Sequence, residues 1–209
     1  MDLIRVEHSA KKYKDWVRIE WNMGRRCNFD CSYCGADLHD NFSKHLPFEK
    51  FDNAVRTMRE FYANKQIRMS LTGGEPFVHP KILEILELFP KYGVDEVSTI
   101  TNGSLPLEKY QRALELIDNL IFSWHFEFLR VNHMKHVLSN LNRKQVKVHL
   151  MYLPGHLEEI KNVVDWLKDN NVKFNVRRIR PMTNKSTGEM NKPYSSGMKF
   201  AGVQWGGAE

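Results

Sequence analysis

The chain has 209 residues, of which 42% are hydrophobic and 27% charged, proportions that are ordinary for a globular protein with one buried core. No apolar run approaches the roughly 18 residues of a membrane-spanning helix, and the N-terminus lacks the continuous apolar stretch of a secretory signal. The formal net charge of +6 is spread along the chain rather than gathered in one patch, so nucleic-acid binding is permitted but not indicated.

The predicted elements alternate between short β-rich runs and longer amphipathic helices, and they begin after an N-terminal extension of residues 1–16. Six strands are predicted at residues 17–22, 67–72, 96–101, 120–125, 146–152 and 173–180. Between them, apolar residues recur at helical spacing in five segments, which start near Phe48, Ile82, Leu107, Val131 and Leu157. From the second strand onward, the strands start at intervals close to the roughly 30-residue βαβ unit.

This strict alternation predicts an α/β fold with a parallel sheet and right-handed crossovers. Six units are too few for a closed eight-unit barrel, which leaves an open doubly wound sheet or a curved partial barrel. In both arrangements ligands bind at the carboxyl ends of the strands. We assign residues 17–180 to this domain. Residues 181–209, which are polar and rich in helix-breaking residues, form a predicted C-terminal tail or flap.

All three cysteines, Cys27, Cys31 and Cys34, lie in the longest predicted connection, at C-x3-C-x2-C spacing. They have no partners elsewhere, so they do not form a disulfide framework, and the expected compartment is a reducing cytoplasm. Three thiolates in one short loop provide three ligands of a metal or iron–sulfur site and leave one position open for chemistry. His39 and His45 follow closely, and either would complete a Cys3His zinc site, which is the structural alternative.

A second motif, Gly73-Gly74-Glu75-Pro76, follows directly after the second predicted strand. Two glycines allow the backbone to turn sharply and to approach a ligand closely, while Glu75 places a carboxylate at the strand end and Pro76 fixes the exit. In isolation the motif is explained as a strand-to-helix turn. In a chain that also has the cysteine loop, the motif indicates a ligand-binding site.

The cysteine loop, followed about 40 residues later by Gly-Gly-Glu-Pro, resembles the radical S-adenosylmethionine (radical SAM) enzymes, and the resemblance covers roughly residues 17–180. Tyr33, directly before the third cysteine, also fits the family pattern. The resemblance implies that the cysteines bind three irons of one [4Fe-4S] cluster and that SAM chelates the fourth. It further implies that reduction cleaves SAM to a 5′-deoxyadenosyl radical, which abstracts hydrogen from a substrate.

For this family we expect a partial (β/α)6 barrel of parallel strands, open on one side, with a short irregular C-terminal tail. Gly73 and Gly74 are expected to meet the SAM amino group, with Glu75 and Pro76 supporting the turn, and Tyr33 to lie near the adenine. The expected electron donor is a protein such as flavodoxin or ferredoxin. No residue is assigned as catalytic.

Polar residues at the carboxyl ends of later strands are the remaining candidates for contact with SAM or substrate. These are Thr101, Asn102, Ser123, His125, Arg178 and Arg180. The alternatives are a plain Asn-Gly turn at Asn102 and a surface salt bridge for the arginines. Glu127 shares a predicted face with Ser123 and His125, or else caps the following helix. Met151 and Tyr152 are expected to pack in the core rather than near adenine.

The substrate is open between a peptide or protein, a nucleoside and a small metabolite. An open side of a six-stranded barrel suits a large substrate without requiring one. Within the family, the alternatives are a glycyl-radical activating enzyme and an RNA-modifying enzyme. Outside it, the alternative is a zinc-stabilised binding module of the Cys3His type.

Overall fold

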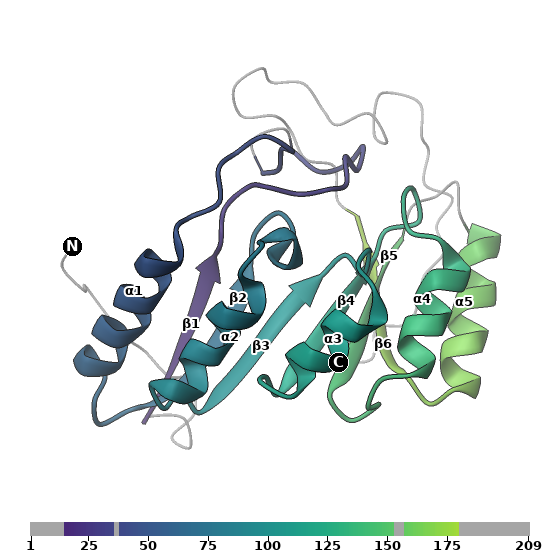
Figure 1. Cartoon of the computed structure of the whole chain (residues 1–209). Coiled ribbons are helices and arrows are strands. Elements are labelled where there is room, and N and C mark those ends of the chain that lie inside the picture. The colour runs from purple at the N-terminus through teal and green to yellow at the C-terminus, as the bar shows by residue number, and fades with distance from the viewer. Residues whose placement is uncertain (1–14, 36–37, 153–156, 180–209) are drawn as a thin grey trace.

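The structure is a computed structural model, and it describes residues 15–35, 38–152 and 157–179 (Figure 1). Most of the predicted N-terminal extension and the whole predicted tail, residues 181–209, lie outside the described residues. The expectation that the tail forms a flap therefore stays a prediction. Within the described part of the chain, no helix is both long enough and apolar enough to span a membrane.

Six strands form one sheet in the order β1-β2-β3-β4-β5-β6, and every neighbouring pair is parallel. The strands are β1 (Trp16–Asn22), β2 (Gln66–Thr72), β3 (Glu96–Thr101), β4 (Asn119–Trp124), β5 (Val146–Tyr152) and β6 (Lys173–Arg178). The helices are α1 (Phe48–Phe61), the one-turn η2 (Pro76–Val78), α2 (Ile82–Lys91), α3 (Leu107–Leu114), α4 (Val131–Ser139) and α5 (Leu157–Asp169). The predicted partial (β/α)6 barrel is confirmed, with the five predicted helices in the crossovers.

The fourth strand ends one residue earlier than its sequence pattern indicates. β4 pairs with β5 up to Trp124, opposite Leu150. His125 then begins a turn, in which its carbonyl accepts hydrogen bonds from the backbone N–H groups of Phe128 and Leu129. The direction of the His125 side chain is therefore determined by a turn rather than by the pleat of the strand.

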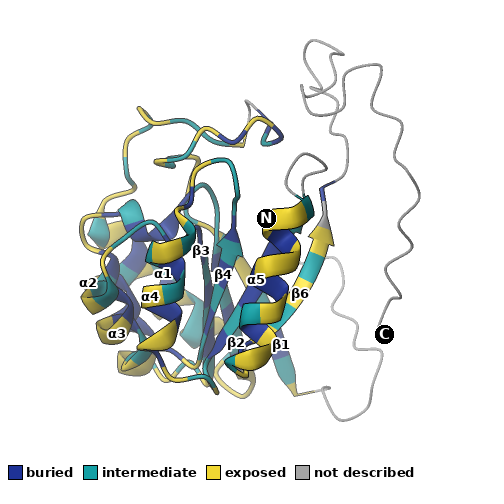
Figure 2. Cartoon of the chain, turned by 90° about the vertical axis from the view of Figure 1, so that its right-hand side faces the viewer, coloured by how far each residue is buried: buried dark blue, intermediate teal, exposed yellow. Residues whose placement is uncertain are grey.

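The helices cover one face of the sheet, and the hydrophobic core lies between the two layers (Figure 2). Alternate strand residues such as Met69, Phe122 and Leu150 are fully buried against helix residues such as Phe89 and Leu138. Because side chains alternate along a strand, the residues between them point to the other face. That face is free of described helices, so most of its residues remain partly or fully exposed.

The connection between β1 and α1 arches over the carboxyl ends of the strands (Figure 1). Its first residues continue the pairing of β1 with β2, because the Met23 N–H donates to the Thr72 carbonyl at 2.8 Å. Two further backbone bonds follow, from Gly74 N–H to the Gly24 carbonyl at 2.8 Å and from Glu75 N–H to the Arg26 carbonyl at 2.9 Å. The cysteine loop is thereby joined to the Gly-Gly-Glu-Pro turn directly before Cys27.

Candidate active site

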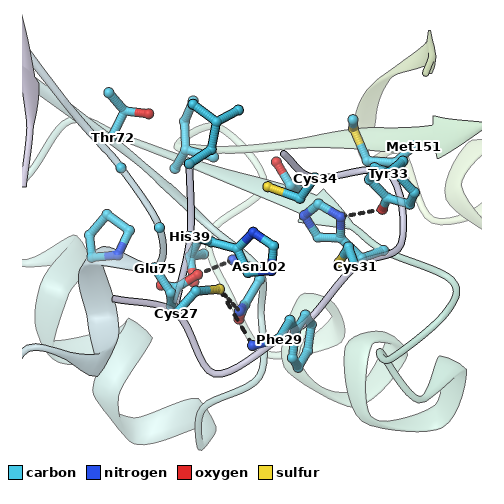
Figure 3. Close-up of a pocket in the computed structure, with 18 of the residues that line it drawn as sticks. Cys27, Phe29, Cys31, Tyr33, Cys34, His39, Thr72, Glu75, Asn102 and Met151 are labelled. Atoms are coloured by element: carbon cyan, nitrogen blue, oxygen red, sulfur yellow. Dashed lines mark hydrogen bonds between the residues drawn. The ribbon is translucent and has the colours of Figure 1, made fainter. Parts of the chain in front are cut away.

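A cavity of about 1010 Å³ opens at the carboxyl ends of the strands. It lies at the upper end of the roughly 300–1,000 Å³ usual for ligand pockets, so it has room for more than one bound group. Of the predicted site residues, these line it: Cys27, Cys31, Tyr33, Cys34, Gly73, Gly74, Glu75, Pro76, Thr101, Asn102, Ser123 and His125 (Figure 3). Arg178 ends β6, but its side chain and the whole of Arg180 lie outside the described residues.

Gly73 and Gly74 are required by close contact between the two motifs. Gly73 has a φ of 133°, and a Cβ there would lie 2.6 Å from the carbonyl oxygen of Gly24. A Cβ on Gly74 would lie 2.7 Å from the carbonyl carbon of Arg25 and closer still to the carbonyl oxygens of Arg25 and Arg26. The N–H of Gly74 is already bonded to Gly24, so these glycines seat the cysteine loop as well as lining the cavity.

Glu75 is buried, with 3% of its surface exposed, and three donors converge on its carboxylate. Oε1 accepts hydrogen bonds from the Phe77 N–H and from the Thr101 hydroxyl, each at 2.9 Å, and Oε2 accepts from the Asn102 N–H. Burial raises the pKa of Glu75 to about 7 against the opposing effect of these donors. The carboxylate ties the end of β3 to the turn after β2 and so positions Asn102.

Asn102 reaches from β3 to the first cysteine. Its amide nitrogen donates to Asn28 Oδ1 at 2.8 Å and lies 3.9 Å from the sulfur of Cys27. Asn28 in turn donates to Ser104 Oγ at 2.8 Å, and the Phe29 N–H points at the Cys27 sulfur from 3.4 Å. Donors at the sulfur are the contacts that tune a thiolate ligand of an iron–sulfur cluster.

Cys31 and Cys34 lie on the other side of the cavity, beside Tyr33, Met151 and Ile179 (Figure 3). Burial raises the pKa of Cys31 to about 12, so its thiol is protonated until a metal displaces the proton. Within the described residues, no three His, Cys, Asp or Glu side chains are already gathered as a metal site. Three thiols facing one cavity nevertheless form the donor set that a cluster with one open iron position requires.

The middle of the cysteine loop is held by the connection between β4 and α4. The Tyr33 hydroxyl is hydrogen-bonded to His125 Nδ1, and the two rings stack with centroids 5.9 Å apart. Burial lowers the pKa of His125 to about 4, so the ring is neutral at physiological pH. Glu127 accepts hydrogen bonds from both the backbone N–H, at 2.8 Å, and the hydroxyl of Ser32. Glu127 thus anchors the loop, whereas Arg130 occupies the N-cap of α4 without a side-chain cap.

The two histidines considered as zinc ligands have other partners. His39 lines the cavity, but its Nε2 is bonded to Asp30 Oδ1 at 2.9 Å and its Nδ1 faces the Gly35 carbonyl at 3.2 Å. His45 packs against the ring of His79, with centroids 4.8 Å apart. In the part of the chain that the structure describes, neither histidine belongs to a group of three side chains that could hold a metal ion.

Two charged residues on the open face of the sheet, Glu20 and Arg177, also line the cavity, although neither was among the predicted site residues. The position of Arg177 on this face could have been recognised from the sequence. Phe174 and Val176 are the apolar residues of β6 and pack toward the core, so alternation places Arg177 on the opposite face. Met151 lines the cavity, contrary to the expected core packing, because it lies on this same face, opposite Arg177 in the register.

A family model described as the radical SAM superfamily matches residues 21–179. Among curated relatives, the S-adenosylmethionine-dependent nucleotide dehydratase RSAD2 of Danio rerio is 26% identical over 188 residues, which cover 84% of this chain and 48% of the relative. GTP 3′,8-cyclase of Clostridium perfringens is 25% identical over 204 residues, covering 90% of this chain and 59% of the relative. The chain therefore spans about half the length of the curated relatives that it matches.

SuiB of Streptococcus suis is among the similar solved structures. Its complex with the precursor peptide SuiA superposes with a TM-score of 0.63 at 18% identity, covering 78% of this chain and 39% of that one. Its complex with S-adenosylmethionine gives a TM-score of 0.60 at 19% identity, covering 82% and 40%. At these identities the likeness concerns the fold, and it agrees with an open sheet of six parallel strands.

Proposed function

The chain belongs to the radical SAM superfamily, whose members are enzymes that use a [4Fe-4S] cluster and SAM, and from this membership we propose that it cleaves SAM reductively to modify a substrate. The observation that carries the proposal is the junction of the two motifs. The backbone bonds from Gly74 to Gly24 and from Glu75 to Arg26 bring the cysteine loop and the Gly-Gly-Glu-Pro turn to one cavity.

Three cysteines would hold the cluster, and the sequence contains only these three, so we propose one cluster per chain. When bound, the cluster and SAM together supply a 5′-deoxyadenosyl radical for hydrogen abstraction. Asn102 and the Phe29 N–H face the sulfur of Cys27 and would tune it as a ligand.

The protein side of the mechanism is the placement of SAM and the exclusion of water. The turn at Gly73 and Gly74 would receive the amino end of SAM, and Glu75 would keep that turn in place from beneath. Tyr33, fixed by its bond to His125, would lie against the adenine, and Ser123 would face the ribose. Phe29 stacks on Phe128, with ring centroids 5.3 Å apart, and this contact joins the cysteine loop to the connection after β4.

The substrate is a separate question. By their names, the two curated relatives act on nucleotides, whereas the solved relative was crystallised with a precursor peptide. These names point in different directions, so they do not choose among the nucleotide, peptide and small-metabolite classes. Glycyl-radical activation and RNA modification stay within the same proposed chemistry.

The test is anaerobic reconstitution with iron and sulfide, followed by SAM and dithionite, which replaces a donor such as flavodoxin or ferredoxin. We expect a brown protein with about four irons per chain whose colour bleaches on reduction, and formation of 5′-deoxyadenosine. Cys31→Ala should abolish both the stable cluster and SAM cleavage. A colourless protein that holds one zinc, or full activity of Cys31→Ala, would contradict the proposal. Deuterium transfer from labelled candidates into 5′-deoxyadenosine would then identify the substrate.

A further inference from the structure

Arg177 is a cation of the cavity wall that the proposed chemistry does not use. It lies on β6, the edge strand of the sheet (Figure 2). Alternation with Phe174 and Val176, which pack toward the core, places it on the face opposite the helices, where it is exposed and lines the cavity. Within the described residues, no carboxylate forms an ion pair with it. A guanidinium that lines a cavity and has no acidic partner is available to bind a ligand.

A buried histidine holds this guanidinium in place. Arg177 Nη2 donates to His149 Nε2 at 3.4 Å, and His149 on the neighbouring strand β5 is only 7% exposed. Burial, together with the positive charges of Arg177 and Lys147, lowers the pKa of His149 to about 4. At physiological pH the imidazole is therefore a neutral acceptor, which orients the arginine without neutralising its charge.

The surroundings of Arg177 are positive. The residues of β4, β5 and β6 that share its face are Asn119, Ile121, Ser123, Lys147, His149, Met151, Lys173, Asn175 and Arg177. Among these described positions there are three cations and no carboxylate. Lys147 Nζ donates to the amide oxygen of Asn175 at 3.1 Å when that amide is oriented to satisfy both of its ends.

The carboxylates of this face belong to the first half of the sheet. Glu96 on β3 forms an ion pair with Arg68 at 2.6 Å, and Glu20 lies on β1 at the opposite edge from Arg177. The charge of the open face therefore changes from mixed on β1–β3 to positive on β5 and β6. A negatively charged ligand is favoured on the side of Arg177.

SAM does not account for this cation. The amino and carboxylate groups of SAM are attached to the same carbon atom, so both bind at one place, which the proposed function puts at Gly73 and Gly74 beside β2. Three strands separate β2 from β6, and at about 4.8 Å per strand the two lie about 19 Å apart along the sheet. The cavity of about 1010 Å³ leaves room for a second ligand on the far side.

We propose that Arg177, oriented by His149, binds an oxyanion group of the substrate, either a phosphate or a carboxylate. This inference rests on the proposed function, because it assumes that SAM occupies the Gly73–Gly74 side of the cavity. The planar guanidinium presents paired N–H groups that match two oxygens of a phosphate or carboxylate. The substrate is thus an anionic molecule whose charged group docks at β5 and β6, away from the Gly73–Gly74 turn.

The experiment is calorimetric titration of the reconstituted protein, loaded with SAM, with three probes: inorganic phosphate, pyrophosphate and succinate. The phosphate probes and succinate distinguish a phosphorylated substrate from a carboxylated one. We expect at least one probe to bind, and Arg177→Gln to bind it about 10- to 100-fold more weakly. Arg177→Lys keeps the charge but loses the planar fork, so its affinity should fall between the two.

Arg18→Gln is the matched control, because it removes the same charge from the same face at β1, the opposite edge. It should change probe affinity by less than about twofold, since exposed charges this far apart are screened by salt. Binding of no probe, or an equal loss in Arg18→Gln, would overturn the inference. So would a loss of SAM affinity in Arg177→Gln with probe binding unchanged.

SAM cleavage without substrate, measured on the wild-type protein and Arg18→Gln, separates this inference from the proposed function. If neither forms 5′-deoxyadenosine, the proposed function fails. If both form it and probe binding is independent of Arg177, only the anion site fails.

Discussion

Gly74→Ala is expected to force the cysteine loop away from the sheet. The added Cβ would lie 2.7 Å from the carbonyl carbon of Arg25 and closer to two carbonyl oxygens. Ordinary carbon contacts need about 3.5 Å, so the backbone of Arg25 and Arg26 must retreat by about 1 Å. These neighbours are main-chain atoms, which cannot move aside as a flexible side chain does.

The expected loss of stability follows from the bonds that this retreat stretches. The bonds from Gly74 to Gly24 and from Glu75 to Arg26, at 2.8 and 2.9 Å, would pass beyond hydrogen-bonding distance. Each contributes about 0.5–1.5 kcal/mol net. Overpacking adds about 1–3 kcal/mol, so the free energy of unfolding should fall by about 2–6 kcal/mol. Cys27, directly after Arg26, would be displaced with the loop.

The assay is urea unfolding of the apo-protein under anaerobic conditions, paired with the iron content per chain after reconstitution. Gly93→Ala is the control. Gly93 has a φ of 69° and open space where a Cβ would stand, so alanine there costs about 1 kcal/mol through backbone strain alone. That variant should retain its iron, whereas Gly74→Ala should lose most of it. If Gly74→Ala matched Gly93→Ala in both stability and iron, the close contact would not seat the loop.

Two other residues yield predictions of the same kind. Because burial raises the pKa of Glu75 from 4.5 to about 7, the folded apo-protein binds more protons than the unfolded chain between these values. Its free energy of unfolding should therefore fall by about 3 kcal/mol as the pH rises from 4.5 to 7 and beyond. An equally steep fall in Glu75→Gln would show that the pH dependence does not come from Glu75. Glu127→Gln should weaken the hydrogen bonds that anchor Ser32 and should lower the iron content per chain after reconstitution. The control is Glu87→Gln, which changes an exposed carboxylate and should leave the iron content unchanged. If both variants retained their iron, Glu127 would not anchor the loop.

The fold was predictable because its signals are local. Each strand and helix of this chain can be recognised from the spacing of apolar residues within one segment, and right-handed crossovers then order the six strands. The prediction was wrong where a turn competes with the pleat, as at His125, which follows β4 instead of ending it. The packing of Met151 was also misjudged, because hydrophobicity by itself does not say which face of a strand a residue occupies.

The prediction also did not identify which residues of β6 lie on the cavity side of the sheet. The sequence pattern drew attention to Arg178 and Arg180, yet the arginine that lines the cavity in the described residues is Arg177. Alternation with Phe174 and Val176 contained this information. Arg177 is free to bind a ligand, however, because no acidic residue occupies the neighbouring open-face positions of β4 and β5. The register of the strands decides which residues lie at those positions.

The sequence by itself determined the chemistry class, because the cysteine spacing and the Gly-Gly-Glu-Pro turn are contiguous motifs. Only the tertiary structure decided how they are held together. Asn28 meets Asn102 across 74 residues of chain, and Ser32 meets Glu127 across 95. Such pairs have no periodic signature, since they arise where the loop after β1 crosses the ends of β3 and β4. Parallel strands bring all their carboxyl ends to one edge, and there distant side chains become neighbours.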